Sequence, residues 1–432
     1  MRTYIILAIT LLIISCEDSS NFTDVTVEQS PSVVDSSFSL SLSNKSFDVV
    51  EGESITFDIK IENNTDQISF FLDGDIDNID WNFFDGDTIT INVNFDVAPI
   101  QKQTRNLRIV GTSINFQDDV LFDLNIEPTS LPDVYLLAGQ SNMVGFSEDG
   151  ARQIFAGGLD EINPRIRQLN VTNNESFNSL NSFQDENSIA IAGNRLALAI
   201  DPLHRSLDSN SNSKVGTRIG FGLSFAKRAI QNTQADIYLV PTGWSDTGFC
   251  RRPREQFEGL LGWNATSNND PAFSGSLLYD RAVARTNLTL SETGGILRGI
   301  LWHQGEADST SIICAQQYEQ NLTLLAKSLR ENVQIDARGN TARGIDSDIP
   351  FIVGTMSMGG SFSNFNEAMT IVDGVHRNIS QIIPHSAFVN NDSLVPPNYP
   401  CGEGSCIHFG STAYRQMGGV YYDQLLNIVN DR

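Results

Sequence analysis

Three separated stretches of the sequence end in polar residues that could carry out acyl transfer. Ser141 is the first candidate, because it follows the apolar run of residues 134–139, where the chain breaks into Gly-Gln-Ser-Asn. A serine at the end of a buried strand and the start of a helix lies among backbone N–H groups that favour negative charge. Such a hydroxyl can attack an ester carbonyl while its own amide helps to hold the oxyanion. The alternative is a serine that only caps the helix.

Gln304 and Glu306 form the second group, directly after the apolar run of residues 296–303. Side chains alternate along an extended chain, so these two would point to the same side. The Gln304 amide could donate a hydrogen bond to an oxyanion, and the Glu306 carboxylate could orient and stabilise a histidinium ion. Alternatively, Glu306 is a structural carboxylate that binds loop amides.

His408 supplies the general base in this scheme. It follows the last expected strand, at 386–392, and precedes an expected helix at 412–429. This position would bring its ring to the same edge of a sheet as Ser141. The other histidines lack this placement: His204, His303, His376 and His385.

These residues need a sheet that brings strand ends together, and the sequence after residue 130 predicts one. Short, fully apolar runs alternate there with helical patterns, which is typical of a parallel sheet covered on both faces. We expect strands at 133–139, 235–243, 296–305, 349–356 and 386–392, and helices at 219–231, 316–333, 364–383 and 412–429. The predicted fold of 131–432 is a three-layer αβα, flavodoxin-like domain with a five-stranded parallel sheet that binds ligands at the carboxyl ends of its strands. Residues 147–218 are too long and polar for an ordinary connection, so we expect loops over the site.

Residues 38–130 have a different texture. Apolar and polar residues alternate in short segments separated by turn signals, which indicates antiparallel strands in a small all-β sandwich of immunoglobulin-like type. No catalytic constellation occurs here. We expect a spacer domain, with carbohydrate binding as the alternative.

The first sixteen residues are typical of a bacterial export signal. Arg2 precedes an apolar run that is too short to span a bilayer and that ends in Ile-Ile-Ser-Cys. This ending resembles a lipobox, in which Cys16 becomes the lipid-modified N-terminus; ordinary secretory cleavage is the alternative. The acidic and serine-rich residues 17–37 would form a flexible linker. We expect an exported protein that is lipid-anchored to the outer membrane and has no other membrane contact.

The remaining cysteines are even in number, which in an exported chain favours disulfides. Cys401 and Cys406 enclose only four residues and are expected to pair, which leaves Cys250 to pair with Cys314. Free thiols are the alternative. The five histidines are scattered in no ligand pattern, so neither a metal nor another cofactor is predicted. The net charge of −24 argues against a nucleic-acid partner, since phosphate binding needs a basic surface.

Three sequence blocks together resemble one known family. The blocks "GQSNM", "GILWHQGEAD" and "IHFGSTAYRQMG", with "SLLYDRAVART" ahead of the second, are similar to those of the sialate O-acetylesterase and acetyl-xylan esterase branch of the SGNH hydrolases. The likeness covers residues 133–432. It implies that Ser141 is the nucleophile and His408 the general base, in an enzyme that removes acetyl groups from oligo- or polysaccharides. It also implies an oxyanion hole made of the Ser141 amide, the Gly243 amide and the Gln304 side chain.

One position departs from that family. Its triad acid is an aspartate three residues before the histidine, and Ser405 occupies this position here. A serine cannot supply the anion that stabilises an imidazolium, so we expect Glu306 to replace it, with Glu403 and Asp392 as further candidates. The departure leaves a second hypothesis open, namely a glycan-binding lipoprotein without catalysis. A general carboxylesterase is the third.

Several polar residues near these blocks are expected to bind substrate. Gln140 and Asn142 flank the predicted nucleophile. Arg251, Arg252 and Arg254 form a basic cluster in an acidic chain and could pair with an acidic sugar. Ion pairs with neighbouring acidic residues are the alternative for this cluster.

Overall fold

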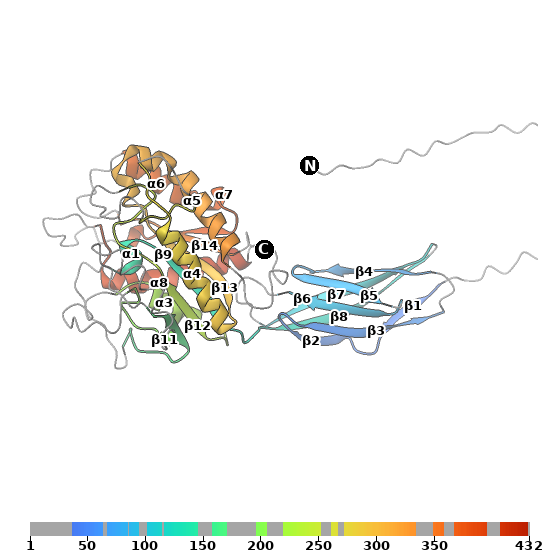
Figure 1. Ribbon diagram of the computed structural model, residues 1–432. Helices are drawn as coiled ribbons and strands as arrows, with labels where there is room; N and C mark the ends of the chain where they lie inside the picture. The colour runs from blue at the N-terminus through green and yellow to red at the C-terminus, as the bar shows by residue number, and fades with distance from the viewer. Residues whose placement is uncertain are drawn as a thin grey trace, which may run out of the picture.

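The structure is a computed structural model, in which an all-β region extends from one side of an α/β region (Figure 1). The described residues are 37–63, 67–84, 86–94, 102–114, 116–145, 158–170, 196–204, 219–251, 261–266, 272–333, 349–357, 367–394 and 407–430. The expected lipidation site Cys16, the expected linker up to residue 36 and the expected Cys401–Cys406 pair lie outside them.

The all-β region consists of two packed sheets. Its strands are β1 (Ser39–Leu42), β2 (Ser46–Val50), β3 (Ser54–Glu62), β4 (Ser69–Gly74), β5 (Ile79–Phe84), β6 (Thr88–Val93), β7 (Gln103–Thr112) and β8 (Gln117–Glu127). The sheet orders are β1-β3-β6-β5 and β2-β8-β7-β4, antiparallel except for the β2–β8 pair. Alternate residues such as Ile89, Ile91, Leu107 and Ile109 are completely buried between the sheets. The alternation of apolar and polar residues in the sequence therefore reflects side chains that point alternately into this core and away from it.

The α/β region is built on one seven-stranded sheet. Its strands are β9 (Asp133–Gly139), β10 (Ile166–Leu169), β11 (Leu196–Leu198), β12 (Ile237–Pro241), β13 (Ile296–His303), β14 (Phe351–Gly354) and β15 (Ser386–Val389), in the order β11-β10-β12-β9-β13-β14-β15. All neighbouring pairs are parallel except β10–β11. The five predicted strands are all present, and their order β12-β9-β13-β14-β15 is that of a doubly wound sheet.

The prediction of five strands was wrong by two. Strands β10 and β11 lie within residues 147–218, which we expected to form loops. The sequence of β10, Ile-Arg-Gln-Leu, contains no apolar run that would indicate a buried strand. The strand is buried because its polar residue Gln168 finds hydrogen-bond partners far along the chain. Gln168 is completely buried and bonds the Leu203 carbonyl (3.0 Å) and the Ile200 amide (3.0 Å).

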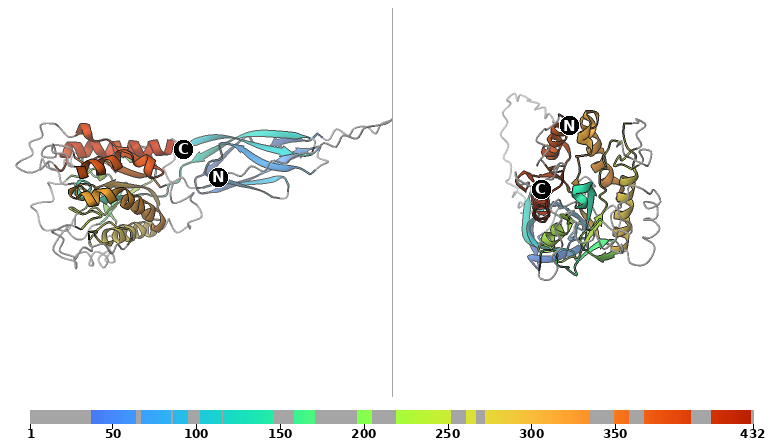
Figure 2. Two further views of the ribbon diagram at one scale, coloured as in Figure 1. Left: turned by 90° about the horizontal axis from the view of Figure 1, so that it is seen from above. Right: turned by 90° about the vertical axis from the view of Figure 1, so that its left-hand side faces the viewer.

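Helices cover both faces of this sheet (Figure 2). They are α1 (Ser141–Val144), α3 (Gly222–Ala229), α4 (Leu277–Thr293), α5 (Ile312–Asn332), α6 (Glu367–Arg377), α7 (Ile379–Ile382) and α8 (Ser411–Asn430), with 3-10 turns η1 (Asp308–Thr310) and η5 (Asp392–Leu394). Alternate residues of β9 divide the core: Val134, Leu136 and Ala138 pack with α4, α5 and α6. Tyr135 and Leu137 pack with α3 and α8 on the opposite face. No helix in the described ranges is long and apolar enough to cross a membrane.

Two helices differ from the prediction. The helix expected at 364–383 is divided into α6 and α7, with Asn378 between them. Helix α4 was not predicted, because its buried face is largely polar and includes Arg281, Arg285 and Thr286. Such a face gives no apolar period in the sequence.

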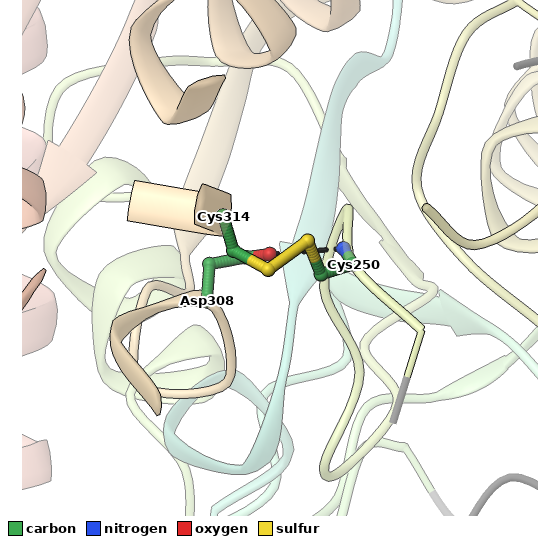
Figure 3. A group of neighbouring side chains, drawn as sticks. All are labelled: Cys250, Asp308 and Cys314. Carbon is green, nitrogen blue, oxygen red and sulfur yellow. Dashed lines mark hydrogen bonds between the residues drawn. A yellow bond between two sulfur atoms is a disulfide. The ribbon is translucent and has the colours of Figure 1, made fainter. Parts of the chain in front are cut away.

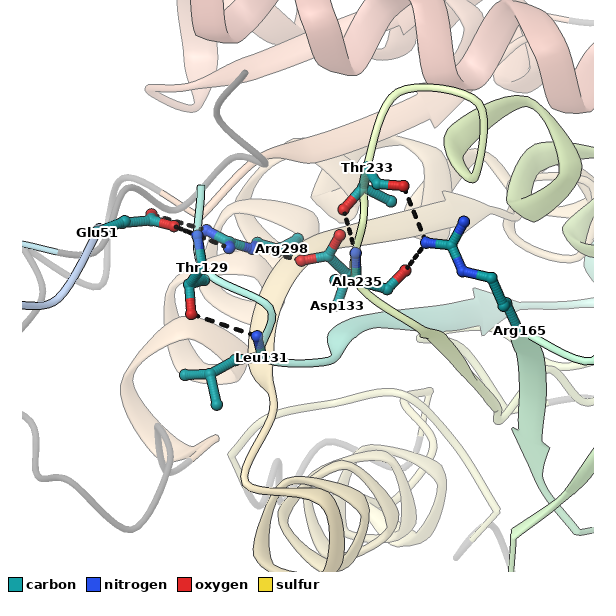
Figure 4. Close-up of polar contacts among 8 residues, drawn as sticks. All are labelled: Glu51, Thr129, Leu131, Asp133, Arg165, Thr233, Ala235 and Arg298. Carbon is teal, nitrogen blue, oxygen red and sulfur yellow. Dashed lines mark hydrogen bonds and ion pairs between the residues drawn. The ribbon is translucent and has the colours of Figure 1, made fainter. Parts of the chain in front are cut away.

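A buried ion cluster joins the two regions (Figure 4). Arg298, near the start of β13, has a side chain that is 2% exposed. Its Nε donates to Asp133 Oδ1 of β9 (2.8 Å), and its Nη1 lies 3.3 Å from Glu51 Oε1. Glu51 belongs to the turn between β2 and β3, so the sandwich is docked on the amino edge of the parallel sheet.

Candidate functional site

The turn that carries Ser141 depends on a glycine. Strand β9 ends at Gly139, whose φ is 137°, and a Cβ added there would lie 2.1 Å from the His303 carbonyl oxygen of β13. Only glycine fits this approach. The Gln140 amide then donates to the same carbonyl (2.9 Å), and α1 begins at Ser141. The chain therefore leaves the buried strand abruptly and presents Ser141 at the carboxyl edge of the sheet.

Ser141 itself is 5% exposed, and its Oγ lies 3.5 Å from Gln140 Nε2. Its amide is in the first turn of α1, where N–H groups have no acceptor within the helix. Among the described residues, the Ser141 N–H donates no hydrogen bond. The amide is therefore available to an incoming oxygen.

Gly243 is held beside this turn. The Thr242 amide donates to the Leu137 carbonyl (2.9 Å), and the Trp244 amide donates to the Gly139 carbonyl (2.9 Å). The backbone at Gly243 therefore runs alongside the last residues of β9. A Cβ at Gly243 would lie 3.0 Å from Met143 Cγ of α1. The Gly243 N–H also has no acceptor within the described part of the chain.

Two buried arginines of α4 fix the loop that carries Gly243. Arg281 Nη1 donates to the Thr242 carbonyl (2.9 Å), and Arg285 Nε donates to the Pro241 carbonyl (3.1 Å). These arginines belong to the "DRAVAR" part of a block that the sequence singled out. This part of the block therefore holds the loop of Gly243 in place through hydrogen bonds to its backbone.

The segment that carries His408 is held by the side chain of Asn142. Asn142 Nδ2 donates to the Ile407 carbonyl (3.0 Å), and the Phe409 amide donates to Asn142 Oδ1 (3.3 Å). The residues on both sides of His408 are thus bonded to the residue that follows Ser141. These contacts connect the turn at Ser141 to the segment before α8, and the meeting of Ser141 with the His408 ring stays a prediction.

Glu306 bonds the same Asn142 side chain. It is 3% exposed, and its Oε1 accepts a hydrogen bond from Asn142 Nδ2 (2.5 Å). Its Oε2 has no hydrogen-bond partner, so no carboxylate oxygen of Glu306 bonds His408 in the described structure. Burial raises the pKa of Glu306 to about 7, and the nearby Asp308 adds to this. The bonded path from Glu306 to the segment that carries His408 thus passes through the amide of Asn142.

Gln304 is completely buried and has no N–H left for an oxyanion. Its Nε2 lies 2.7 Å from Asp308 Oδ2, 3.1 Å from the Thr247 carbonyl and 3.2 Å from Gln140 Oε1. An amide nitrogen carries two hydrogens, so these acceptors use both. The expected oxyanion role is therefore corrected: Gln304 ties together the loops beneath the site.

Gln140 and Asn142 were expected to bind substrate, and burial corrects this as well. Gln140 is 2% exposed, and its Oε1 accepts from the Ala307 amide (3.1 Å). Asn142 is completely buried. Neither side chain presents a surface to a ligand, and both instead connect the turn at Ser141 to neighbouring segments.

The predicted Cys250–Cys314 disulfide is confirmed, with an S–S distance of 2.04 Å (Figure 3). It joins the end of the Gly243 loop to the first turn of α5. Asp308 Oδ1 reinforces this junction by accepting from the amides of Phe249 (3.1 Å) and Cys250 (3.0 Å). Asp308 and the two sulfurs are close enough to hold a metal ion, but sulfurs bonded to each other cannot act as thiolate ligands.

The other predicted residues lie apart from Ser141 or outside the described ranges. Arg251 is exposed, and Arg252 and Arg254 are outside the described residues, as are Glu403 and Ser405. Asp392, a further candidate for the triad acid, forms an ion pair with Arg377, whose Nη2 lies 3.0 Å from each carboxylate oxygen. Asp392 is therefore part of a surface ion pair.

The sequence interpretation missed Asp308 and Tyr414. Both lie within blocks that it quoted, so their presence in "HQGEAD" and "STAYRQ" was the available signal. Their partners are far away in the sequence, which is why their contacts could not be inferred.

The chain is similar to several known proteins. A family model described as carbohydrate esterase, sialic acid-specific acetylesterase, matches residues 132–427. A probable carbohydrate esterase of Arabidopsis thaliana is 29% identical over 137 residues, which is 32% of this chain and 44% of the relative, so the match spans less than half of that protein. The crystal structure of NanS is similar with a TM-score of 0.48 and 20% identity, over 70% of this chain and 99% of that chain. An X-ray structure of a protein from Arabidopsis thaliana has a TM-score of 0.47 and 22% identity, over 69% of this chain and 98% of that chain.

The fold and the site define a mixed α/β protein with a serine at the carboxyl edge of a largely parallel sheet. Because the family model matches more than half of the chain, the protein belongs to the carbohydrate esterase, sialic acid-specific acetylesterase family.

Proposed function

We propose that the protein is a carbohydrate O-acetylesterase that removes acetyl groups from sugar hydroxyls through a serine acyl-enzyme. One observation carries the proposal. The Ser141 and Gly243 amides have no acceptor among the described residues, and the residue after Ser141 holds the backbone on both sides of His408. Amides in this arrangement can stabilise the charge that develops on an attacked carbonyl oxygen.

In the first step, Ser141 Oγ attacks the acetyl carbon and transfers its proton to the His408 ring. The carbonyl oxygen becomes an oxyanion that the Ser141 and Gly243 amides hold. Collapse of the intermediate expels the sugar oxygen, which takes the proton back from His408. In the second step, water attacks the acyl-enzyme with His408 again as base, and acetate leaves. Glu306 supports His408 through Asn142 rather than by direct contact.

The nucleophile is tested by Ser141→Ala. We expect this variant to keep its fold and to lose the release of acetate from p-nitrophenyl acetate and from acetylated sugars. Ser276→Ala is the matched control, because Ser276 precedes α4 and its hydroxyl bonds the exposed Asp280 (2.7 Å). Full activity of Ser141→Ala, with a melting curve like that of the wild type, would rule out the assignment.

A second candidate function is glycan binding without catalysis. It is favoured by the serine at position 405, where the family has its triad aspartate. Side-by-side assays with acetylated xylan, pectin and sialoglycans separate the two functions. Binding with no acetate release from any of them would favour the second candidate.

We also propose that the sandwich is an immunoglobulin-like spacer in an exported protein that is lipid-anchored at Cys16. The orders β1-β3-β6-β5 and β2-β8-β7-β4 support the spacer, because they arrange the strands as in sandwiches of that type. The basic residues 251, 252 and 254 would favour acidic sugars. Comparing hydrolysis of neutral and acidic acetylated glycans after replacing Arg251 with Gln tests this preference.

A further inference from the structure

The side chain of Asn142 uses its whole hydrogen-bonding capacity. Its two N–H groups donate to Glu306 Oε1 (2.5 Å) and to the Ile407 carbonyl (3.0 Å). Its Oδ1 accepts from the Tyr414 hydroxyl (2.6 Å) and the Phe409 amide (3.3 Å). A primary amide has two donors and two acceptor positions, so every position is filled.

This arrangement also fixes which way the amide points. The Ile407 carbonyl can only accept and the Phe409 amide can only donate, so exchanging Nδ2 and Oδ1 would oppose like groups at both contacts. Asn142 must therefore direct an N–H at Glu306. The role left for Glu306 Oε1 is that of an acceptor.

The four partners come from separate segments of the chain. Glu306 follows β13, the Ile407 and Phe409 groups belong to the segment before α8, and Tyr414 is in the first turns of α8. All of these contacts converge on the residue after Ser141, in a place where Asn142 and Tyr414 are completely buried. Displacing this one amide would release the segment that carries His408 from the turn that carries the nucleophile.

We propose that Asn142 is the positioning residue of the site, and that Glu306 acts by holding Asn142 and not by supplying charge to the imidazole. The inference rests on the proposed function, because it assigns His408 as the group that is positioned. Within the described residues, the hydrogen bonds of Asn142 go to Glu306, Ile407, Phe409 and Tyr414 and not to Ser141 Oγ. The required property of Glu306 is then an oxygen that accepts one hydrogen bond, whether or not the group is ionised.

The proposal predicts different outcomes for two isosteric substitutions, Asn142→Asp and Glu306→Gln. Asn142→Asp removes both donors and sets an oxygen against Glu306 Oε1 and the Ile407 carbonyl. We expect kcat to fall by about 100-fold or more with little change in KM, the loss typical of a displacement of about 1 Å. Glu306→Gln keeps an oxygen that can accept from Asn142, so its kcat should stay within about 10-fold of wild type, whereas Glu306→Ala should lose more.

The pH profile distinguishes positioning from charge. The acid limb of kcat/KM reports the imidazole of His408 in the free enzyme. If Glu306 does not stabilise the histidinium ion by charge, Glu306→Gln leaves this limb where it is in the wild type. A kcat for Glu306→Gln as low as that of Asn142→Asp, with the limb moved to lower pH, would overturn the proposal.

A readout without substrate keeps this test apart from that of the proposed function. The NMR titration of the His408 ring should be unchanged in Glu306→Gln and altered in Asn142→Asp, whether or not the wild type releases acetate. Wild type without esterase activity contradicts the proposed function alone. If Asn142→Asp does not fold, the same measurements on Glu306→Gln and Glu306→Ala test the proposal. Equal losses of kcat in these two variants would refute the hydrogen-bond role of Glu306.

Discussion

The two edges of the parallel sheet both bury carboxylates, but they treat the charge in opposite ways. At the amino edge, Glu51 and Asp133 surround the guanidinium of Arg298. At the carboxyl edge, Glu306 is buried to a similar degree, and its nearest partner is the neutral amide of Asn142. One cluster is a structural joint in which a single cation is shared by two carboxylates, whereas the other is a carboxyl group that bonds no cation among the described residues.

This difference appears in the pKa values of the buried groups. Burial by itself lowers the pKa of the Arg298 guanidinium, but Glu51 and Asp133 more than compensate and raise it overall. Burial raises the pKa of Glu306 to about 7, and no cation opposes the shift. A carboxyl group in the second situation can be neutral or charged near neutral pH. The comparison therefore teaches that burial alone does not separate a structural carboxylate from one beside a reactive site.

The largest effect is expected at the amino edge. Arg298→Met leaves Glu51 and Asp133 buried without their cation, which should lower the free energy of unfolding by about 3–5 kcal/mol. Chemical denaturation at pH 7 measures this loss. Arg108→Met is the control, since Arg108 pairs with Asp73 on the surface of the sandwich and should change stability by less than about 1 kcal/mol.

The folded fraction of Arg298→Met should release acetate at the wild-type rate, because the cluster lies at the edge opposite Ser141. A variant as stable as the surface control would show that the two regions do not depend on this joint. A stable but inactive variant would show that the two edges are coupled.

The next effect is a pH-dependent one at the carboxyl edge. The pKa of Glu306 is about 7 in the folded protein and near 4.5 in the unfolded chain, so between these values the folded state binds more protons. Wild-type stability therefore falls as pH rises through this window, by about 3 kcal/mol in total at about 1.4 kcal/mol per pKa unit. Glu306→Gln lacks this loss, so its advantage over wild type should grow from pH 4 to pH 8.

Denaturation of both proteins across that range checks the prediction. Burial also raises the pKa of Asp201 to about 7. Its contribution to the pH dependence of stability is the same in both proteins and therefore cancels in the difference. A stability difference independent of pH would mean that the carboxyl group of Glu306 has an ordinary pKa.

The smallest effect is expected at Asp308, which is buried and accepts N–H groups at both oxygens. Asp308→Asn would set an amide nitrogen against the Gln304 amide or the backbone of Cys250, which should lower stability by about 1–3 kcal/mol. Acetate release should fall with it, because the loop of Gly243 is held there. Asp280→Asn on the surface is the control and should stay within about 0.5 kcal/mol of wild type. An Asp308→Asn variant equal to that control would remove the claim that this carboxylate anchors the loop.

The sequence predicted those parts of the fold that depend on apolar burial. The five central strands are buried and mostly apolar, and the alternation of the sandwich reflects a core between two sheets. Strands β10 and β11 and helix α4 could not be predicted in this way, because polar residues such as Gln168 and Arg285 are buried there through distant carbonyl groups. A periodic pattern carries no information about such partners.

The same limit applies to the site. Topology predicted that Ser141 and His408 would approach one edge, since strand ends converge there. Whether a polar side chain faces substrate or the interior depends on neighbours far along the chain: Asn142 bonds Ile407 and Gln304 bonds Thr247. These contacts reversed the expectations for Asn142 and Gln304. The catalytic roles of Ser141 and His408 stay predictions.

The docking of the sandwich at Glu51 has a practical consequence for handling the protein. Because the β1–β8 region projects from the side of the sheet opposite α1, its far end is the most distant part of the described molecule from Ser141 (Figure 1). A sensor chip or resin coupled through that end would leave the Ser141 edge facing solution. Long polymeric ligands could then reach it without passing the support.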